Sequence, residues 1–198
     1  MRGLALCAAL GILASACGGT AAAPSAPATR LPTAPVIRTA APTAAPACVV
    51  KPVTFVKAPS KAVITLVKGG SITITLRPDK APKTVTNFAS VALSGCYDGL
   101  TFHRVVANFV AQGGDPLGTG TGGGDQPTEL SDLPFIKGAL GVARAGDIKI
   151  SNDRQFFICT GDCLNLNNAY TNFGQVISGQ DVADKIVVGD KIKTITVE

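Results

Sequence analysis

The sequence predicts a mainly β protein, a closed antiparallel barrel capped by two α-helices. Short runs rich in β-branched and aromatic residues recur between turn residues from about position 61 to the end. Only two segments carry helical signals. Apolar residues make up 46% of the 198 residues, which is enough for a core, and the length fits one ordinary domain plus a tail.

The predicted barrel begins with a hairpin. Val63–Val67 is a β-branched run, and Lys68-Gly69-Gly70 supplies turn residues. In Ser71–Leu76 apolar residues alternate with threonines, which is typical of a strand with one buried face. The two runs therefore predict paired strands that present one apolar face to a core.

Helical signals follow the hairpin. Asp79 and Pro82 suit a helix start, and Gly95 suits the C-terminal cap. Between them one apolar stripe has the spacing i, i+3, i+4 and i+7, at Val85, Phe88, Ala89 and Ala92. A second helix fits Asp181–Val187 and ends before Gly189.

The remaining strands are predicted from short apolar or alternating runs. These runs are Leu100–Val106, Phe109–Gln112, Ala139–Ala143, Phe156–Cys159, Phe173–Ile177 and Ile192–Val197. Many short strands with two helices favour the closed barrel over other ways of burying the apolar faces.

The N-terminus predicts a secretory signal peptide over residues 1–16. Arg2 supplies a positive charge, and the apolar run Leu4–Leu13 is too short to span a bilayer as a mature helix. Ala14-Ser15-Ala16 is a cleavage signal that Cys17 follows directly. The run LASAC also resembles a bacterial lipoprotein box, although that box prefers Leu where this chain has Ala14. Because a Cys directly after the cleavage signal would otherwise be a coincidence, we expect lipidation of Cys17.

Residues 17–47 predict a tether. After the Cys, this segment consists mainly of Ala, Pro and Thr, a composition that cannot build a core and favours extended chain. Fully extended, it could reach up to roughly 90 Å at ~3.1 Å per residue. We expect it to hold a domain at residues 48–198 off the outer face of the cell membrane. An inert tail on a secreted protein is the alternative.

Charge does not indicate a nucleic-acid partner. The formal net charge is +5, but the first 47 residues contribute three Arg and no acidic residue. From Cys48 onward 15 Lys and Arg face 13 Asp and Glu, without a dense basic run. A nearly neutral domain of this kind lacks the basic patch that nucleic-acid binding requires.

Four Cys remain once the signal peptide and Cys17 are set aside, and we expect disulfides among them. An even number outside the cytoplasm favours pairing. Four Cys allow three connectivities, and a local Cys159–Cys163 bridge would leave Cys48–Cys96. A zinc site built from these Cys and His103 is the less favoured reading, so no metal is expected.

Two segments carry the candidate chemistry. Phe102–Asp115 reads FHRVVANFVAQGGD and holds an Arg, an aromatic residue and a Gln. Gln155–Thr160 reads QFFICT and adds a second Gln and two Phe. The two segments resemble the cyclophilin family of peptidyl-prolyl isomerases, and the likeness extends over about residues 61–198. The resemblance implies a closed eight-stranded barrel with two helices. It also implies an activity that needs no cofactor.

The implied chemistry needs few groups. An X-Pro bond isomerises slowly because its amide has partial double-bond character, with a barrier of ~18–20 kcal/mol. Catalysis needs a surface that binds the twisted amide better than either planar form. On twisting, the prolyl nitrogen regains a lone pair that a guanidinium can stabilise. The resemblance places this catalytic Arg at Arg104.

The resemblance also assigns the groups that bind substrate. Gln112 would hold the peptide backbone, and Ala143, Arg144 and Ala145 would pair with it through their own backbone. The proline slot is assigned to Phe109, Val110, Phe157 and Leu166, with Tyr170 as a wall of the pocket. Gln155 and Gly120 would line the groove beyond the slot. Gln155 and Phe157 are two residues apart, so both should point to one face of a strand.

The chain departs from the family pattern at four places. Val110 stands where Met is usual, which keeps the slot apolar, and Tyr170 stands where His is frequent. Asn165 replaces a Trp typical of forms that bind cyclosporin strongly, which puts that binding in doubt. Asp147–Arg154 is more charged than the usual Gly/Ser-rich stretch, so peptide preference could change there.

Two tempting motifs receive simpler interpretations. His103 would suit a general base, but strand alternation points it away from Arg104, and the resemblance makes it structural. Gly118–Gly124 lacks the Lys-Ser/Thr of a phosphate loop and suits a flexible loop beside the groove.

The sequence therefore predicts an exported peptidyl-prolyl isomerase that assists the folding of other exported proteins. We expect a monomer that acts on proline-containing polypeptides and touches the membrane only through its lipid. A peptide-binding module of the same fold with little turnover, or a wall-associated scaffold, are the alternatives. The four residues Arg104, Phe109, Gln112 and Phe157 together favour the enzyme, because a binding module has less use for the Arg.

Overall fold

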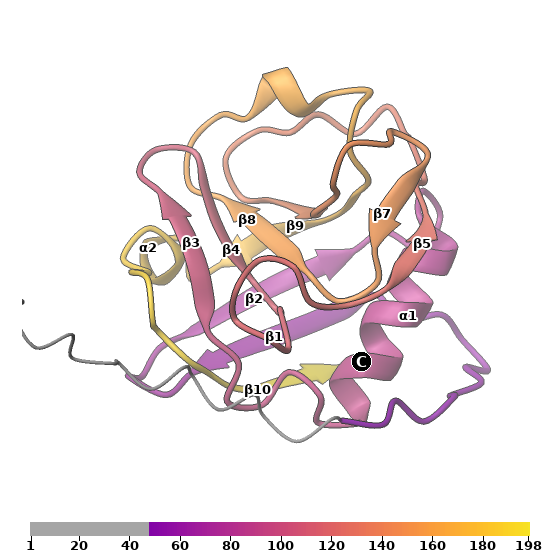
Figure 1. Ribbon diagram of the computed structural model, residues 1–198, viewed down its shortest axis with the longest axis horizontal. Coiled ribbons are helices and arrows are strands. Elements are labelled where there is room, and N and C mark those ends of the chain that lie inside the picture. Colours follow the sequence, from indigo (N-terminus) through magenta and orange to yellow (C-terminus); the bar gives the residue numbers. More distant parts are fainter. Residues whose placement is uncertain (1–47) are drawn as a thin grey trace, which may run out of the picture. The chain divides into compact units, whose positions relative to one another are not determined.

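The computed structural model describes residues 48–198 (Figure 1). The predicted signal peptide, Cys17 and the tether lie outside the described residues. The described part contains ten strands and two α-helices. Neither of these helices has the length and apolar character of a membrane span.

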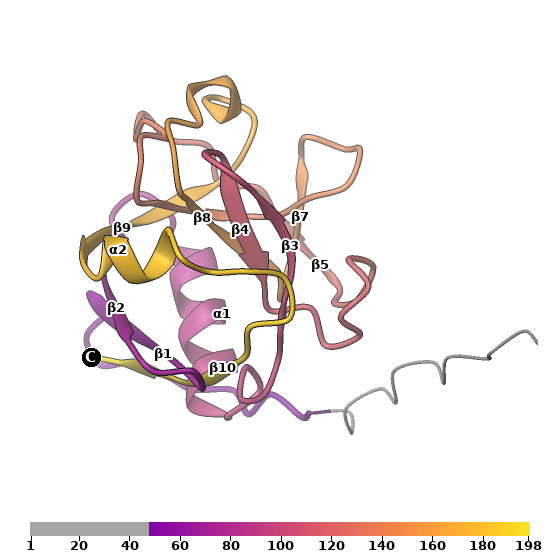
Figure 2. The same ribbon diagram turned by 90° about the vertical axis from the view of Figure 1, so that its left-hand side faces the viewer.

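Eight strands form one antiparallel sheet that curls into a barrel (Figures 1 and 2). Their order across the sheet is β10-β1-β2-β9-β6-β8-β4-β3. The bounds are β1 Lys61–Leu66, β2 Ser71–Leu76, β3 Phe102–Val106, β4 Val110–Gly113, β6 Ala139–Val142, β8 Phe156–Cys159, β9 Asn172–Ser178 and β10 Ile192–Val197.

The two edge strands, β3 and β10, meet along a short seam. Thr101 and Lys191 form an isolated bridge, and the amide of Phe102 donates to the carbonyl oxygen of Asp190 at 2.8 Å. The predicted mainly β fold with eight barrel strands is confirmed, and its closure is confined to this seam at the start of β3.

The hairpin of β1 and β2 packs as its alternation predicts. Ile64 on β1 lies opposite Ile72 on β2 and Ile195 on β10, and all three side chains are buried. Because successive residues of a strand face opposite sides, the intervening threonines and Val63 stay partly exposed. The apolar face of this hairpin forms one wall of the core.

Helix α1 spans Pro82–Leu93, with Pro82 in its first turn as predicted. Its predicted stripe is buried, and Phe88 contacts the rings of Tyr97, Phe156 and Phe173 at centroid distances of 5.2–5.6 Å. Such tilted and edge-to-face contacts are the favoured geometry for aromatic pairs. This cluster joins α1 to the strand β8 that carries the candidate site.

The second helix is shorter than predicted. Helix α2 covers only Gln180–Ala183, whereas the prediction was Asp181–Val187. Beyond Ala183 the amides of Lys185 and Ile186 donate to carbonyls three residues back, so the chain tightens into 3₁₀-type turns before Gly189. Helices α1 and α2 lie on opposite sides of the barrel in Figure 1.

Two short strands escaped the sequence prediction. β5 (Asp125–Pro127) and β7 (Ile150–Asn152) pair only with each other. They carry no apolar alternation, and polar contacts extend the pairing: Thr128 and Ser151 share a hydroxyl hydrogen bond at 2.8 Å. A 3₁₀ turn, η1 (Leu164–Leu166), also lay outside the predicted elements.

Candidate active site

A row of four residues crosses the barrel wall. Arg104 on β3 lies opposite Gln112 on β4, Gln112 lies opposite Phe157 on β8, and Phe157 lies opposite Gly141 on β6. Directly opposed residues of neighbouring antiparallel strands place their side chains on the same face of a sheet. The register therefore places the guanidinium, the amide and the aromatic ring side by side.

This row opens into a cavity of about 380 Å³, called here the Arg104 cavity. Its lining contains nine of the predicted site residues: Arg104, Phe109, Val110, Gln112, Ala143, Arg144, Phe157, Leu166 and Tyr170. Asn165 completes the lining; sequence reasoning singled it out only as a departure from the family pattern. A larger cavity of about 900 Å³ lies behind the glycine-rich loop and contains none of the predicted substrate-binding residues.

The floor of the Arg104 cavity is apolar. The ring of Phe157 stacks on Phe135, with centroids 5.7 Å apart, and meets Tyr170 edge-on at 5.9 Å. Val110 and Leu166 belong to the same buried cluster. A small apolar ring such as proline could lose its water contacts here, which is favourable in proportion to the apolar area covered.

The polar rim is an ordered relay of side chains. Arg104 Nη1 lies 3.4 Å from Gln112 Oε1, Gln112 Nε2 donates to Gln155 Oε1 at 2.9 Å, and Gln155 Nε2 donates to the Gly122 carbonyl at 2.8 Å. The long first contact leaves the exposed guanidinium with spare donors. The relay therefore orients Gln112 firmly and Arg104 only weakly.

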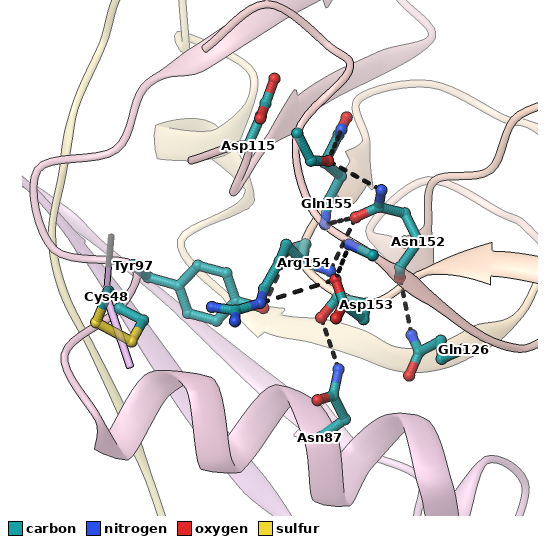
Figure 3. Close-up of polar contacts among 12 residues, drawn as sticks. Cys48, Asn87, Tyr97, Asp115, Gln126, Asn152, Asp153, Arg154 and Gln155 are labelled. Atoms are coloured by element: carbon teal, nitrogen blue, oxygen red, sulfur yellow. Dashed lines mark hydrogen bonds and ion pairs between the residues drawn. A yellow bond between two sulfur atoms is a disulfide. The ribbon is translucent and has the colours of Figure 1, made fainter. Parts of the chain in front are cut away.

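Asn152 holds Gln155 in place (Figure 3). Its Oδ1 accepts hydrogen bonds from the amides of Arg154 and Gln155, and its Nδ2 donates to the Gly122 carbonyl at 3.0 Å. Side-chain bonds from Asn to amides two and three residues on are typical of turns. Asn in the sequence NDRQ was the signal that could have revealed this support.

Hydrogen bonds and a ring contact fix Arg144, which also lines the cavity. Its Nε donates to the Ala169 carbonyl at 2.8 Å, and its Nη1 donates to the carbonyls of Ala145 and Gly146 at 3.0 and 3.1 Å. The guanidinium carbon lies 4.5 Å from the centroid of the Tyr170 ring, a cation–π contact. Arg144 therefore ties the segment after β6 to the segment before β9.

Three predicted site residues lie outside the lining of the Arg104 cavity: Gly120, Ala145 and Gln155. Gly120 belongs to a loop organised by the buried carboxylate of Asp115, which accepts hydrogen bonds from the amides of Leu117, Thr119 and Gly120. Because these amides already bind a carboxylate, they are not free to cradle a phosphate.

His103 lies behind this loop. Neither imidazole nitrogen has a hydrogen-bond partner within the described residues, and both are shielded from solvent. Burial lowers the pKa of His103 below its ordinary value, with the Arg104 charge acting in the same direction and Asp115 opposing it. This side chain is absent from the lining of the Arg104 cavity.

The four Cys of the domain fall into two kinds. Cys48 and Cys96 form a disulfide with a Cα–Cα distance of 5.4 Å. Cys159 and Cys163, the candidates for a local bridge, are free and buried, and the Cys163 thiol donates to the Phe109 carbonyl at 3.1 Å. Burial raises the pKa of both thiols above the ordinary value.

The sequence of the described domain is similar to that of known proteins. Residues 62–197 match the family described as cyclophilin type peptidyl-prolyl cis-trans isomerase/CLD. Peptidyl-prolyl cis-trans isomerase B of Bacillus subtilis is 45% identical over 134 residues, covering 66% of this chain and 92% of that protein. A peptidyl-prolyl cis-trans isomerase of Helicobacter pylori is 42% identical over 132 residues, covering 64% of this chain and 80% of that protein.

A solved structure shares the fold. The cyclophilin type peptidyl-prolyl cis-trans isomerase of Cryptosporidium parvum, crystallised in the presence of the dipeptide Ala-Pro, has a TM-score of 0.64 and 28% sequence identity. The match covers 70% of this chain and 98% of that chain. The chain therefore belongs to the cyclophilin-type family and is a peptidyl-prolyl cis-trans isomerase.

Proposed function

We propose that the Arg104 cavity is the catalytic site and that it isomerises X-Pro bonds in unfolded or flexible exported polypeptides. The observation that carries this proposal is the single row of Arg104, Gln112 and Phe157 across three neighbouring strands. It sets a cation, an amide and an apolar floor beside one another, as a twisted prolyl amide requires.

Each part of the row has a role in this mechanism. The proline ring rests on Phe157, and Gln112 holds the peptide backbone in the orientation set by Gln155. Arg104 donates to the prolyl nitrogen as the amide twists and its lone pair localises. Because this donation is strongest when the amide is twisted, it lowers the barrier rather than only tightening binding.

The remaining lining residues complete the slot. Phe109, Val110, Leu166 and Tyr170 enclose the ring, whereas the backbone of Ala143–Ala145 pairs with the bound peptide. Gly120 and Gln155 border the groove beyond the slot. No step transfers a proton or forms a covalent bond, so the proposed reaction uses no cofactor.

The test compares kcat/KM for an Ala-Pro peptide among three proteins: wild type, Arg104→Ala and Arg77→Ala. Arg77 is a matched control because it pairs with Asp79 through two hydrogen bonds and does not line the cavity. Removing one donor to a transition state costs roughly 10²–10³-fold. We expect that loss in Arg104→Ala alone. An Arg104→Ala protein as active as wild type would exclude Arg104 as the donor.

We further infer that the protein is exported and anchored through a lipid on Cys17, with residues 17–47 as a tether to a monomeric domain. The sequence LASAC and the Cys48–Cys96 disulfide support this, because disulfides persist mainly outside the cytoplasm. Mass spectrometry of the protein from bacterial membranes should find a lipid-modified N-terminal Cys17. A Cys17→Ser protein should leave the membrane fraction; membrane retention of that variant would contradict the inference.

A further inference from the structure

The charges around the Arg104 cavity are not balanced. Of the four Arg in residues 48–198, two form ion pairs: Arg77 with Asp79 and Arg154 with Asp153. The other two, Arg104 and Arg144, form none with any described residue, and both line the Arg104 cavity. Two unpaired cations therefore share one small space.

No carboxylate lines that space. Its other residues are apolar or neutral. Asp147, three residues beyond Arg144, uses its Oδ1 to accept from the amide of Lys149 at 2.8 Å. Asp162, close to Leu166 in sequence, accepts from the amide of Lys137 at 3.0 Å. Neither carboxylate lines the cavity or forms an ion pair with Arg104 or Arg144, so the lining keeps a formal charge of +2.

Arg144 is held rigidly, but not all of its hydrogen-bond donors have a partner in the described part of the chain. Nε and Nη1 donate to three carbonyl oxygens, and the guanidinium stacks on Tyr170. Its Nη2 has no hydrogen-bond partner within residues 48–198. Arg carries five N–H donors and remains charged at any physiological pH. A fixed cation with two free donors thus borders the slot.

The size of the cavity relates this charge to the substrate. A sphere of about 380 Å³ is about 9 Å across, which is the length of two to three extended residues at ~3.3 Å each. With the proline beside Arg104, a residue one or two positions away lies within reach of Arg144. A negatively charged side chain at that position would form an ion pair with Arg144.

We propose that this isomerase prefers X-Pro bonds that have an Asp or Glu within two residues of the proline, and that Arg144 sets this preference. The proposal rests on the proposed function, because it takes the Arg104 cavity as the catalytic site. It narrows the substrate class from any exposed X-Pro bond to those in acidic sequence. Two unit charges 4 Å apart in water attract by ~1 kcal/mol, which corresponds to about a five-fold change in kcat/KM.

The test uses short peptides in which one residue near the proline is Glu, Gln or Lys. Four sets place that residue one or two positions before the proline, or one or two positions after it. Gln matches Glu in shape and lacks its charge. At low salt we expect kcat/KM of the wild-type protein to be about five-fold higher for Glu than for Gln in at least one set, and lowest for Lys. The difference should shrink in 0.5 M NaCl, where screening is strong.

Three variants separate charge from structure. Arg144→Gln should remove the preference, and Arg144→Lys should retain part of it because the charge remains while the fork is lost. Lys149→Gln is the matched control, since this exposed cation does not line the cavity and its loss should leave the preference intact.

The outcomes distinguish the two proposals. Isomerisation of the Gln peptides without any preference for Glu would overturn the charge preference and leave the proposed function standing. A Glu preference that survives in Arg144→Gln would show that Arg144 does not set it. No isomerisation of any peptide by the folded protein would overturn both proposals.

Discussion

Gly141 offers a sharp test of how the sheet supports the site. It lies on β6 directly opposite Phe157, the floor of the Arg104 cavity. A Cβ added at Gly141 would lie 2.2 Å from Phe157 Cζ and 2.6 Å from Phe135 Cε1. Ordinary contacts begin at about 3.4 Å, so the Phe157 ring in Gly141→Ala must retreat by at least about 1.2 Å. The Phe135 ring stacks on Phe157 and is itself crowded by the new Cβ, so the Phe157 ring cannot shift without disturbing the apolar floor of the slot.

The expected effect is larger on activity than on stability. Overpacking a core by one methyl group costs roughly 1–3 kcal/mol of unfolding free energy, which a domain with ordinary stability survives. A misplacement of about 1 Å at a reacting centre costs up to roughly 10²-fold in rate. We therefore expect kcat/KM of Gly141→Ala for an Ala-Pro peptide to fall ten- to a hundred-fold while the protein remains folded.

The assay measures kcat/KM and urea unfolding on the same preparations, beside Gly174→Ala as a matched control. Gly174 is another buried strand glycine, on β9, where an added Cβ would lie 2.9 Å from the Thr75 carbonyl oxygen. Its three nearest atoms all belong to residues that do not line the cavity. The control should lose stability and keep its activity per folded molecule. A Gly141→Ala protein with unchanged kcat/KM would refute the argument that this glycine makes room for the Phe157 ring.

Three further predictions concern stability and reactivity. The Cys48–Cys96 disulfide spans 48 residues, so the paired change to Ser should lower the unfolding free energy by ~4 kcal/mol on the loop-entropy estimate; a loss below ~1 kcal/mol in urea melts would contradict it. Cys159 and Cys163 are buried with raised pKa values, so iodoacetamide should label neither in the native protein and both after unfolding; rapid native labelling would show that the thiols open to solvent. Because burial lowers the pKa of His103, the unfolded chain binds this proton more readily, and the unfolding free energy should fall as the pH drops below the unfolded value of about 6.5; His103→Gln should weaken that dependence, and an identical pH profile would contradict the assignment.

The parts of the fold that alternation or helical spacing encodes were predictable. The β2 strand and the buried stripe of α1 follow from patterns that place apolar residues on one face. The β5–β7 pair was not predictable, because polar contacts hold it and no apolar period marks it. The length of α2 was also missed. After Ala183 the amides of Lys185 and Ile186 donate to carbonyls three residues back instead of four, and no residue type in the sequence indicates this change.

For the candidate site, the residues could be named from their motifs, but their electrostatic state could not. Arg104 and Arg144 are both visible in the sequence, as are the acidic residues near them. Both paired Arg meet a carboxylate one or two positions away, Arg77 with Asp79 and Arg154 with Asp153. Arg144 has Asp147 three positions away and still forms no ion pair, because carbonyl oxygens that include the distant Ala169 hold its guanidinium. That distant contact is not visible in the local sequence, so the charge of the cavity emerges only from the structure.

The charged stretch Asp147–Arg154 illustrates the difference. Sequence reasoning placed a change of peptide preference there, because its charges border the groove. In the structure Asp147 accepts from the amide of Lys149, and Asp153 accepts from the amide of Gly124 at 2.6 Å and pairs with Arg154. Asp153 and Arg154 thus pair with each other, and neither they nor Asp147 and Lys149 line the Arg104 cavity. Two unpaired cations line the slot, and Arg104 is the one that we assign to the prolyl nitrogen. Hydrogen bonds hold the other, Arg144, beside the slot without neutralising it, so a change of preference should follow that side chain.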